Sequence, residues 1–300
     1  MTLILRRLIR ATLRAVAFAS VLATSGVFAA VIGFSVRSDV DRVLYRIDMA
    51  TGIATALGPT GFSKIEALAV NAGGEIYGVN PATAQLVKCS SVTGACSTVG
   101  LLIGLPQVQA NAGLTFASNG ALYLAANAVV YRVDPASGGV APLGGTGPAL
   151  SGLAGVIPTA ACASGLFGIG GNSDRGKLYC INLLTGAAVL VGTLTVNPLD
   201  SGLDGDPVTG VVWGISNDAP GQVFAINPAT LSVTNLNPVT LAGAPIGGFE
   251  SLAIQHTADV AAVPSVPTMS GTALLLLSLL LASALMVTHR RTLAVASRRK

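Results

Sequence analysis

The sequence predicts an all-β protein, a five-bladed β-propeller built from four-stranded antiparallel blades. Two short phrases alternate along the chain and recur every 42 to 48 residues. Residues that favour tight turns join the phrases, and the last copy lacks a partner strand that the start of the chain can supply. A repeat of this length with four strands per unit is typical of propeller blades, whereas a β-helix repeat is far shorter and a sandwich repeats less regularly.

The first phrase is a short apolar strand that ends in a polar residue and is followed by a Thr-Gly or Ser-Gly turn. Its clearest copy, residues 44–52, reads LYRIDMATG. Five copies occur, marked by the polar residue at the end of each strand: Asp48, Ser90, Asp134, Asn182 and Asn227. Apolar runs bounded by turn residues in this way predict the strands of hairpins.

The second phrase alternates with the first and contributes a strand pair of its own. Its first copy reads LAV, a polar turn and then EIYGV, over residues 68–79. The turns contain Asn, Asp, Pro and Gly, which supply positive or preset φ angles. Together the phrases give four strands per unit, and we expect blades over residues 62–100, 113–144, 152–192 and 201–236.

The two ends of the propeller region are expected to form the fifth blade together. Residues 249–254 repeat the start of the second phrase, but no partner strand follows them. Residues 31–35 are an apolar strand that precedes the first copy of the first phrase. A composite blade of residues 249–254 and 30–58 would close the ring and remove an exposed sheet edge. In that blade Asp48 would serve a turn rather than chemistry.

Charge separates the ends of the chain from its middle. The net charge is +4, but nine of the 17 basic residues lie within the first 14 or the last 11 positions. Residues 30–271 contain eight basic and 13 acidic residues, a net charge of −5. A mildly acidic middle argues against a nucleic-acid-binding surface, and basic ends are typical of membrane topology signals.

The N-terminus has the organisation of a secretory signal peptide. A basic segment, residues 1–14, precedes 13 uncharged and mainly apolar residues, 15–27. Ala29 and Ala30 follow as small residues of the kind that a signal peptidase reads. An uncleaved anchor is the alternative, but 13 residues are short for a bilayer core of about 30 Å. We expect export with cleavage after Ala29 or Ala30, and we place residues 1–29 outside the fold.

The C-terminal region predicts a membrane segment. After the propeller, residues 30–256, a linker rich in Val, Ala and Pro covers residues 257–268. Residues 269–288 are 20 uncharged residues with a Leu-rich centre, and residues 289–300 form a basic tail. Twenty helical residues span about 30 Å, which matches the hydrocarbon core of a bilayer. Because basic residues stay on the cytoplasmic side, the propeller would face outward.

The entry into this segment resembles a known sorting signal. The order VPTMS, a Leu-rich span and an Arg-Arg pair is similar to the IPTL-CTERM signal of Gram-negative bacteria, with the motif at Val266, Pro267, Thr268 and Met269. Met269 stands where the family has Leu, and the Trp of the family pattern is missing. The resemblance implies recognition by an exosortase-like transpeptidase, cleavage near the motif and transfer to the cell surface. A plain single-span anchor in the inner membrane is the alternative.

The strand phrases also resemble those of bacterial extracellular propellers related to NHL-type repeats. That resemblance covers roughly residues 30–256, and it implies a fold more strongly than an activity.

Four cysteines occur, and an even number in an exported chain indicates disulfides. Cys89 and Cys96 lie on strands that a Thr-Gly hairpin joins, so they can face each other. Cys162 and Cys180 flank the strand at residues 165–169, which leaves their pairing open. Zinc binding is the alternative, but the spacings match no common zinc pattern and no histidine lies nearby.

The sequence contains no recognised catalytic motif. It lacks a P-loop, a G-x-S-x-G elbow and an H-E-x-x-H helix, and His256 is the one histidine away from the membrane segment, so a Ser-His-Asp triad is not expected. Asp200, Asp204 and Asp206 form an acidic cluster that could bind Ca²⁺. Their spacing lacks the EF-hand pattern, however, and residues 206–210 are typical of a hairpin turn.

Glu66 and Glu250 are the candidates for a metal site. Each stands two residues before the Leu of an innermost strand, so both can face the mouth of the central channel. Propeller lactonases hold metals at this place with Glu, Asn and Asp side chains. The equivalent residues in the other blades are poor ligands: Ala112, Ser151 and Ser201.

These observations predict a non-enzymatic binding or structural module at the bacterial cell envelope, without a cofactor and with protein or polysaccharide partners on its loop faces. A metal-dependent, lactonase-like hydrolase that uses the central channel is the alternative, and an envelope scaffold without a small ligand is a third possibility. Fold alone does not decide among them. The number of acidic and amide side chains gathered at the channel mouth separates the first two.

Overall fold

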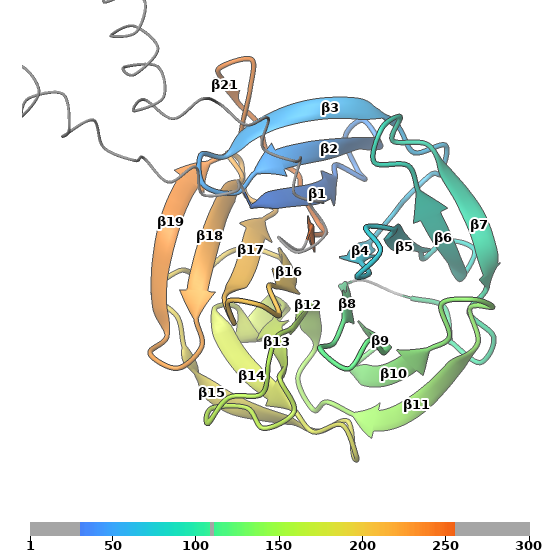
Figure 1. The fold of residues 1–300 in the computed structure, drawn as a ribbon, viewed down its shortest axis with the longest axis vertical. Helices are drawn as coiled ribbons and strands as arrows, with labels where there is room; N and C mark the ends of the chain where they lie inside the picture. Colours follow the sequence, from blue (N-terminus) through green and yellow to red (C-terminus); the bar gives the residue numbers. More distant parts are fainter. Residues whose placement is uncertain (1–30, 109–110, 256–300) are drawn as a thin grey trace, which may run out of the picture. The chain divides into compact units, whose positions relative to one another are not determined.

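The computed structural model describes residues 31–108 and 111–255, and these residues form five sheets arranged as a ring, antiparallel except for one short parallel pair (Figure 1). Apart from one 3₁₀ turn, η1 (Asn172–Asp174), the regular elements are all strands. The predicted all-β propeller with five four-stranded blades is therefore confirmed. By its internal contacts the chain divides into residues 1–259 and residues 260–300, and the described residues all belong to the first unit.

Four blades are formed by consecutive strands, ordered from the channel to the rim. The first blade contains β4 (Ala67–Val70), β5 (Ile76–Asn80), β6 (Gln85–Cys89) and β7 (Cys96–Leu101). The second contains β8 (Ala112–Phe116), β9 (Leu122–Ala126), β10 (Val129–Val133) and β11 (Val140–Gly145). The third contains β12 (Leu150–Gly155), β13 (Leu166–Gly170), β14 (Lys177–Ile181) and β15 (Ala188–Thr193). The fourth contains β16 (Ser201–Gly205), β17 (Val212–Ser216), β18 (Gln222–Asn227) and β19 (Ser232–Pro238).

The closing blade combines the two ends of the described chain, as the sequence predicts. It contains β1 (Ile32–Val36), β2 (Val43–Asp48) and β3 (Ile53–Pro59), and β22 (Ala253–Gln255) is its innermost strand. β22 pairs antiparallel with β1, with Ile32 opposite Gln255. A short hairpin of β20 (Thr240–Leu241) and β21 (Ala244–Pro245) extends this sheet beyond β3, an addition that the sequence phrases did not indicate.

Small residues let the innermost strands approach one another around the axis. A Cβ atom on Gly113 would lie 2.5 Å from the backbone nitrogen of Leu153, and one on Gly152 would lie 2.6 Å from that of Leu203. Real Cβ atoms do not approach a neighbouring backbone so closely, so these positions require glycine. The Gly-Leu pairs of the second phrase are thus explained by the narrowness of the channel.

The Thr-Gly turns of the first phrase join neighbouring blades at the rim. The outermost strands follow the circumference of the ring, and the end of each meets the turn of the next blade (Figure 1). A Cβ on Gly94 would overlap the backbone of Gly58, and the same relation links Gly186 with Gly144. Asp48 accepts hydrogen bonds from the backbone nitrogens of Ala50 (2.9 Å) and Thr51 (3.3 Å). Its predicted role in a turn is confirmed.

The apolar core lies between neighbouring sheets rather than at the axis. Phe167, Phe224 and Phe249 are among its largest fully buried side chains. Burying such a side chain contributes about 1.5–3 kcal/mol. Each blade is therefore held mainly by the faces that it presents to its two neighbours.

Both disulfides are present, and they link neighbouring strands or loops within single blades. Cys89 on β6 lies opposite Cys96 on β7 and is bonded to it, as predicted. Cys162, in the loop before β13, is bonded to Cys180 on β14, which settles the pairing that the sequence left open. The described chain contains no free cysteine.

Several sequence predictions fall outside the described residues. These are the signal peptide (1–29), the linker (257–268), the membrane segment (269–288), the basic tail (289–300) and His256. Over residues 31–108 and 111–255 no helix is long and apolar enough to cross a membrane.

Candidate functional site

One end of the central channel is lined by polar side chains that precede the innermost strands or follow the second strands. We call it the polar mouth. Its small cavity, about 20 Å³, is lined by Glu66, Asn111, Ala112, Ser151, Asp200, Asn217 and Glu250. Most of these side chains stand at the starts of inner strands that belong to different blades. Because they meet at one end of the channel, the inner strands all run away from that end. The channel therefore has chemically distinct ends.

The polar mouth brings together the two glutamates singled out from the sequence, and Lys64 lies between them. The Lys64 Nζ is 3.1 Å from Glu66 Oε2 and 3.6 Å from Glu250 Oε2, and it donates a hydrogen bond to Asp39 Oδ2 (3.1 Å). Glu66 belongs to the first blade, whereas Asp39 and Glu250 belong to the closing blade. Lys64 thus joins the two blades that meet where the ring closes.

Burial and like charge control protonation at the polar mouth. Burial raises the pKa of Glu250 to about 8, and the nearby charge of Glu66 adds to this effect. Burial and the charge of Glu66 also raise the pKa of Asp200. For Lys64, burial alone would lower the pKa, but the charges of Glu66 and Glu250 outweigh it and raise the pKa above the usual value. The mouth therefore carries more carboxyl groups than it can keep ionised near neutral pH.

Several oxygen atoms at the polar mouth are buried without a hydrogen-bond partner in the described structure. They are Glu66 Oε2, Asp200 Oδ1, Glu250 Oε2 and the neighbouring Ser201 Oγ. Buried polar atoms usually have a partner, so unpaired ones call for an explanation. Lys64 compensates the charge of the two glutamates but not that of Asp200, which is not among its ion pairs.

The sequence identified only part of this group. It did not indicate Lys64, Asn111 or Asn217, and it assigned Asp200 to an acidic cluster instead. A feature of the sequence could have revealed two of these residues. In two blades the position equivalent to Glu66 holds a small residue, Ala112 or Ser201, and a polar residue, Asn111 or Asp200, comes directly before it. The polar mouth thus gathers five acidic and amide side chains, rather than the two glutamates alone.

The three acidic residues of the predicted cluster take separate roles along one strand and its turn. Asp200 lines the polar mouth. Asp206 accepts hydrogen bonds from the Val208 backbone nitrogen (2.8 Å) and the Thr209 hydroxyl (2.7 Å), so its predicted turn is confirmed. Among the described residues no group of three or more His, Cys, Asp or Glu side chains is arranged to hold a metal ion.

Asp204 is buried inside the ring, where it connects three blades. Its carboxylate accepts hydrogen bonds from Thr115 Oγ1 of the second blade (2.7 Å), the Gly205 nitrogen of its own strand (2.9 Å) and the Ile254 nitrogen of β22 (2.8 Å). Burial raises its pKa to about 7, although these hydrogen bonds act in the opposite direction. Asp204 therefore fastens the closing strand rather than facing a ligand.

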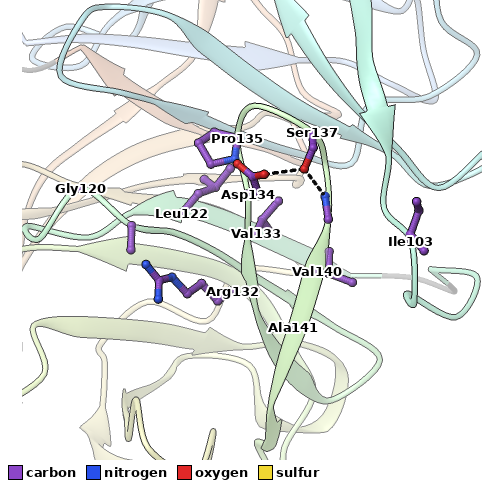
Figure 2. A pocket seen from close by; sticks show the side chains of 12 residues that line it. Ile103, Gly120, Leu122, Arg132, Val133, Asp134, Pro135, Ser137, Val140 and Ala141 are labelled. Carbon is purple, nitrogen blue, oxygen red and sulfur yellow. Dashed lines mark hydrogen bonds between the residues drawn. The ribbon is translucent and has the colours of Figure 1, made fainter.

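The opposite end of the channel carries the turns that follow the innermost strands, and we call it the loop face. Two open pockets of about 650 Å³ and 420 Å³ lie there and share Gly120 and Pro135. The first surrounds the hairpin at residues 134–139 (Figure 2). The second is lined mainly by apolar groups from three blades, including Phe116, Pro207 and Val208. The two pockets therefore adjoin each other on this face.

Within the hairpin of the first pocket, the acidic group is already satisfied. Asp134 accepts a hydrogen bond from Ser137 Oγ (Figure 2). It also accepts one from the Ala136 nitrogen (3.0 Å), and the Ser137 bond lowers the pKa of Asp134. Arg132 stands on the exposed side of β10 and forms no ion pair within the described residues. The pocket therefore offers an apolar lining beside one guanidinium group.

Comparison with known proteins gives a clear result for one part of the chain. Residues 264–291 match the IPTL-CTERM motif. The chain carries this sorting signal at its C-terminus. The resemblance seen at residues 266–269 is thereby confirmed, and such a signal implies export and sorting to the cell surface. The two disulfides fit an extracellular location.

Solved structures resemble the propeller at low sequence identity. No curated protein matches the sequence. Among solved structures, a chain of the nidogen/laminin complex is 15% identical, with a TM-score of 0.44 over 75% of this chain and 84% of that chain. Virginiamycin B lyase from Staphylococcus aureus is also 15% identical, with a TM-score of 0.40 over 65% of this chain and 62% of that chain.

Proposed function

We propose that the protein is exported, is sorted to the surface of a Gram-negative cell through its C-terminal signal, and acts there as a non-enzymatic binding module. The motif at residues 264–291 supports the destination. The contrast between the two ends of the channel supports the mode of action, and this contrast is the observation on which the proposal rests.

The loop face suits a macromolecular partner, whereas the polar mouth does not suit an organic substrate. The two joined pockets of the loop face measure about 650 and 420 Å³. The cavity at the polar mouth is about 20 Å³, close to the volume that holds a single water molecule. Small-molecule sites are usually of several hundred cubic ångströms. A substrate could therefore enter the polar mouth only after its side chains had moved.

A protein partner fits the loop face better than a polysaccharide. The second pocket is largely apolar, and Val208 in its wall is 60% exposed. Among the residues that line the two pockets, Phe116 is the one aromatic side chain, and it is only 8% exposed. The buried centre of a protein interface is mainly apolar, whereas stacking of a sugar would need an exposed aromatic ring.

A photo-crosslinking residue tests this proposal in cells that sort the full chain. Placed at Val208, it should crosslink to a discrete envelope protein. Placed at Leu236 on the rim, which is 48% exposed, it should not. If Val208 gives no product, or gives the same products as Leu236, the loop face is not the binding surface.

A metal-dependent, lactonase-like hydrolase is the second candidate, and the buried oxygens of Glu66, Asp200 and Glu250 that lack a hydrogen bond favour it. Carboxylate and amide oxygens are ligands for hard cations such as Ca²⁺. Against it, Lys64 lies between the glutamates where a cation would bind, and the mouth lacks an arranged set of three ligands within the described residues. The residues as they stand do not fit a resident metal, and we derive no catalytic step from one.

Titration calorimetry of the purified full chain with Ca²⁺ and with Zn²⁺ separates the two candidates. The binding module should give no heat attributable to the polar mouth. Saturable heat that disappears in Glu66→Gln, but not in Glu75→Gln in the turn between β4 and β5 at the opposite end of the channel, would favour the hydrolase.

The final attachment is a separate part of the proposal. We propose that an exosortase-like enzyme processes the C-terminal signal, and that a plain anchor in the inner membrane is the alternative outcome. An epitope tag after Lys300 distinguishes the two. Sorting predicts loss of the tag from the mature surface protein, whereas an intact tag retained in the inner membrane of wild-type cells would count against it.

A further inference from the structure

In the first blade, a basic residue on the third strand has an acidic partner in the turn before the second strand. Lys88 of β6 lies opposite Tyr77 of β5. Glu75 stands two residues before Tyr77, so it points to the same face of the sheet, and it forms an ion pair with the Lys88 Nζ. Asn71 also donates a hydrogen bond to this carboxylate (2.7 Å). Both charges of the pair are therefore compensated within the blade.

The second blade keeps the cation and lacks the carboxylate. Arg132 of β10 lies opposite Tyr123 of β9, the same register that the basic residue has in the first blade. Two residues before Tyr123 the chain carries Ala121, where the first blade has Glu75. Arg132 is exposed and forms no ion pair within the described part of the chain. A carboxylate from another molecule could therefore take the place that Glu75 fills in the neighbouring blade.

This place lies where the two pockets of the loop face adjoin. Arg132 and Ala121 line the first pocket, and Gly120, next to Ala121, lines both pockets. The one carboxylate that lines the first pocket, that of Asp134, is turned toward Ser137 instead (Figure 2). The guanidinium group therefore borders the hollow without an acidic partner from the described residues.

The lining of the pockets favours a carboxylate over a phosphate. Arg132 is the one basic side chain among the residues that line the two pockets. A phosphate group carries up to about two negative charges and is commonly bound by a cluster of basic residues. A carboxylate carries a single charge and can pair with one guanidinium group through two parallel hydrogen bonds. The second pocket is mainly apolar, so it suits an apolar side chain beside that carboxylate.

We propose that Arg132 binds an aspartate or glutamate of the partner protein, and that an apolar side chain next to this acidic residue enters the second pocket. The incoming carboxylate would stand against Arg132 as Glu75 stands against Lys88 in the first blade. This inference rests on the proposed binding function of the loop face and specifies what that face recognises. The charged pair would fix the position of the partner, while the apolar pocket would add contact area.

Variants of the full chain that carry the photo-crosslinking residue at Val208 test the inference. Arg132→Ala should lower the yield of the crosslinked envelope protein by about tenfold, the effect of losing a hydrogen bond to a charged group. Ala121→Glu should lower it similarly, because a carboxylate placed as Glu75 is in the first blade would neutralise Arg132 within the chain. Arg46→Ala is the matched control, since Arg46 is exposed at the equivalent position of β2 but lines neither pocket, and it should leave the yield unchanged. Equal thermal unfolding would show that the variants fold.

Two further variants separate charge from bulk. Ala121→Gln adds a side chain of the same size without the charge, so it should lower the yield much less than Ala121→Glu. Arg132→Glu should lose the product, and the product should return when one acidic residue of the partner, located by mass spectrometry of the crosslink, is replaced by arginine.

The outcomes distinguish this inference from the proposed function on which it rests. If Val208 gives the same yield with and without Arg132→Ala, the inference fails while the loop face remains the binding surface. If Val208 gives no product in the otherwise unaltered chain, both fail. A product that resists proteinase digestion, as a polysaccharide would, also overturns the inference.

Discussion

Replacing Asp204 by alanine tests whether the centre of the ring is held by one carboxylate. The change removes the acceptor for three donors, Thr115 Oγ1 and the backbone nitrogens of Gly205 and Ile254. The Ile254 bond is the important one, because it ties the closing strand β22 to the fourth blade.

The expected loss follows from the burial of these donors. A buried donor that loses its partner costs about 1–3 kcal/mol. Relief of the burial of the carboxylate itself, which is 2% exposed, offsets part of this cost. At pH 4, where the folded side chain is protonated, we therefore expect Asp204→Ala to lower the free energy of unfolding by about 3 kcal/mol. Asp204→Asn keeps an acceptor for Thr115 and Gly205, so it should lose about half as much.

Denaturant unfolding followed by tryptophan fluorescence measures this loss directly. Trp213 is the one tryptophan in the sequence, is 6% exposed and lies opposite Asp204 on the neighbouring strand. Asp48→Ala is the matched control, because Asp48 accepts backbone hydrogen bonds in an exposed turn, and it should cost less than about 1 kcal/mol. A loss at Asp204 no larger than that at Asp48 would refute the role assigned to the buried carboxylate.

The remaining predictions concern protonation, close packing, a covalent link and an ion pair. Burial raises the folded pKa of Asp204 from 3.8 to about 7. The stability that Asp204 contributes should therefore be complete below pH 4 and decline by about 4 kcal/mol as the pH rises to 7. The Asp204→Asn variant should show no such decline in unfolding experiments. Gly202→Ala should cost about 2 kcal/mol or more because the new Cβ meets the backbone of the closing blade, while Gly145→Ala, with its nearest contact at 3.7 Å, should be tolerated in thermal melts. Removing the Cys162–Cys180 disulfide by a double serine substitution should cost about 3 kcal/mol in denaturant titrations if constraint of the unfolded chain dominates. Lys64→Met should destabilise the protein more at pH 9 than at pH 6, since the carboxylates that it neutralises are more fully ionised at high pH; a loss independent of pH would contradict the ion pairing described above.

The fold could be predicted from the sequence because its determinants are local and repeated. Each strand phrase ends in its own turn residue, as at Asp48. The count of phrases leaves three strands over at the start of the propeller and one at its end, which together complete a blade. The hairpin of β20 and β21 was not predicted, because two-residue strands at Thr240 and Ala244 carry no period of their own.

The polar mouth was predicted only in part, because it depends on how the strands are aligned across blades. Glu66 and Glu250 share one sequence position, and this made them visible as a pair. Asn111 and Asp200 reach the same cavity from the preceding position, and Asn217 arrives from the end of a second strand. Such an offset of a single residue between blades is set by packing at the axis, which no single repeat encodes.

The closure of the ring also determines where mechanical load falls. The described chain ends at Gln255 on the innermost strand, and only three residue pairs join that strand to β1. A force applied through the C-terminal attachment would first act on this shortest strand of the inner ring, and through it on the hydrogen bond between Ile254 and Asp204. If the protein is held through its C-terminal signal as proposed, its resistance to shear would therefore depend on the last strand of the described residues.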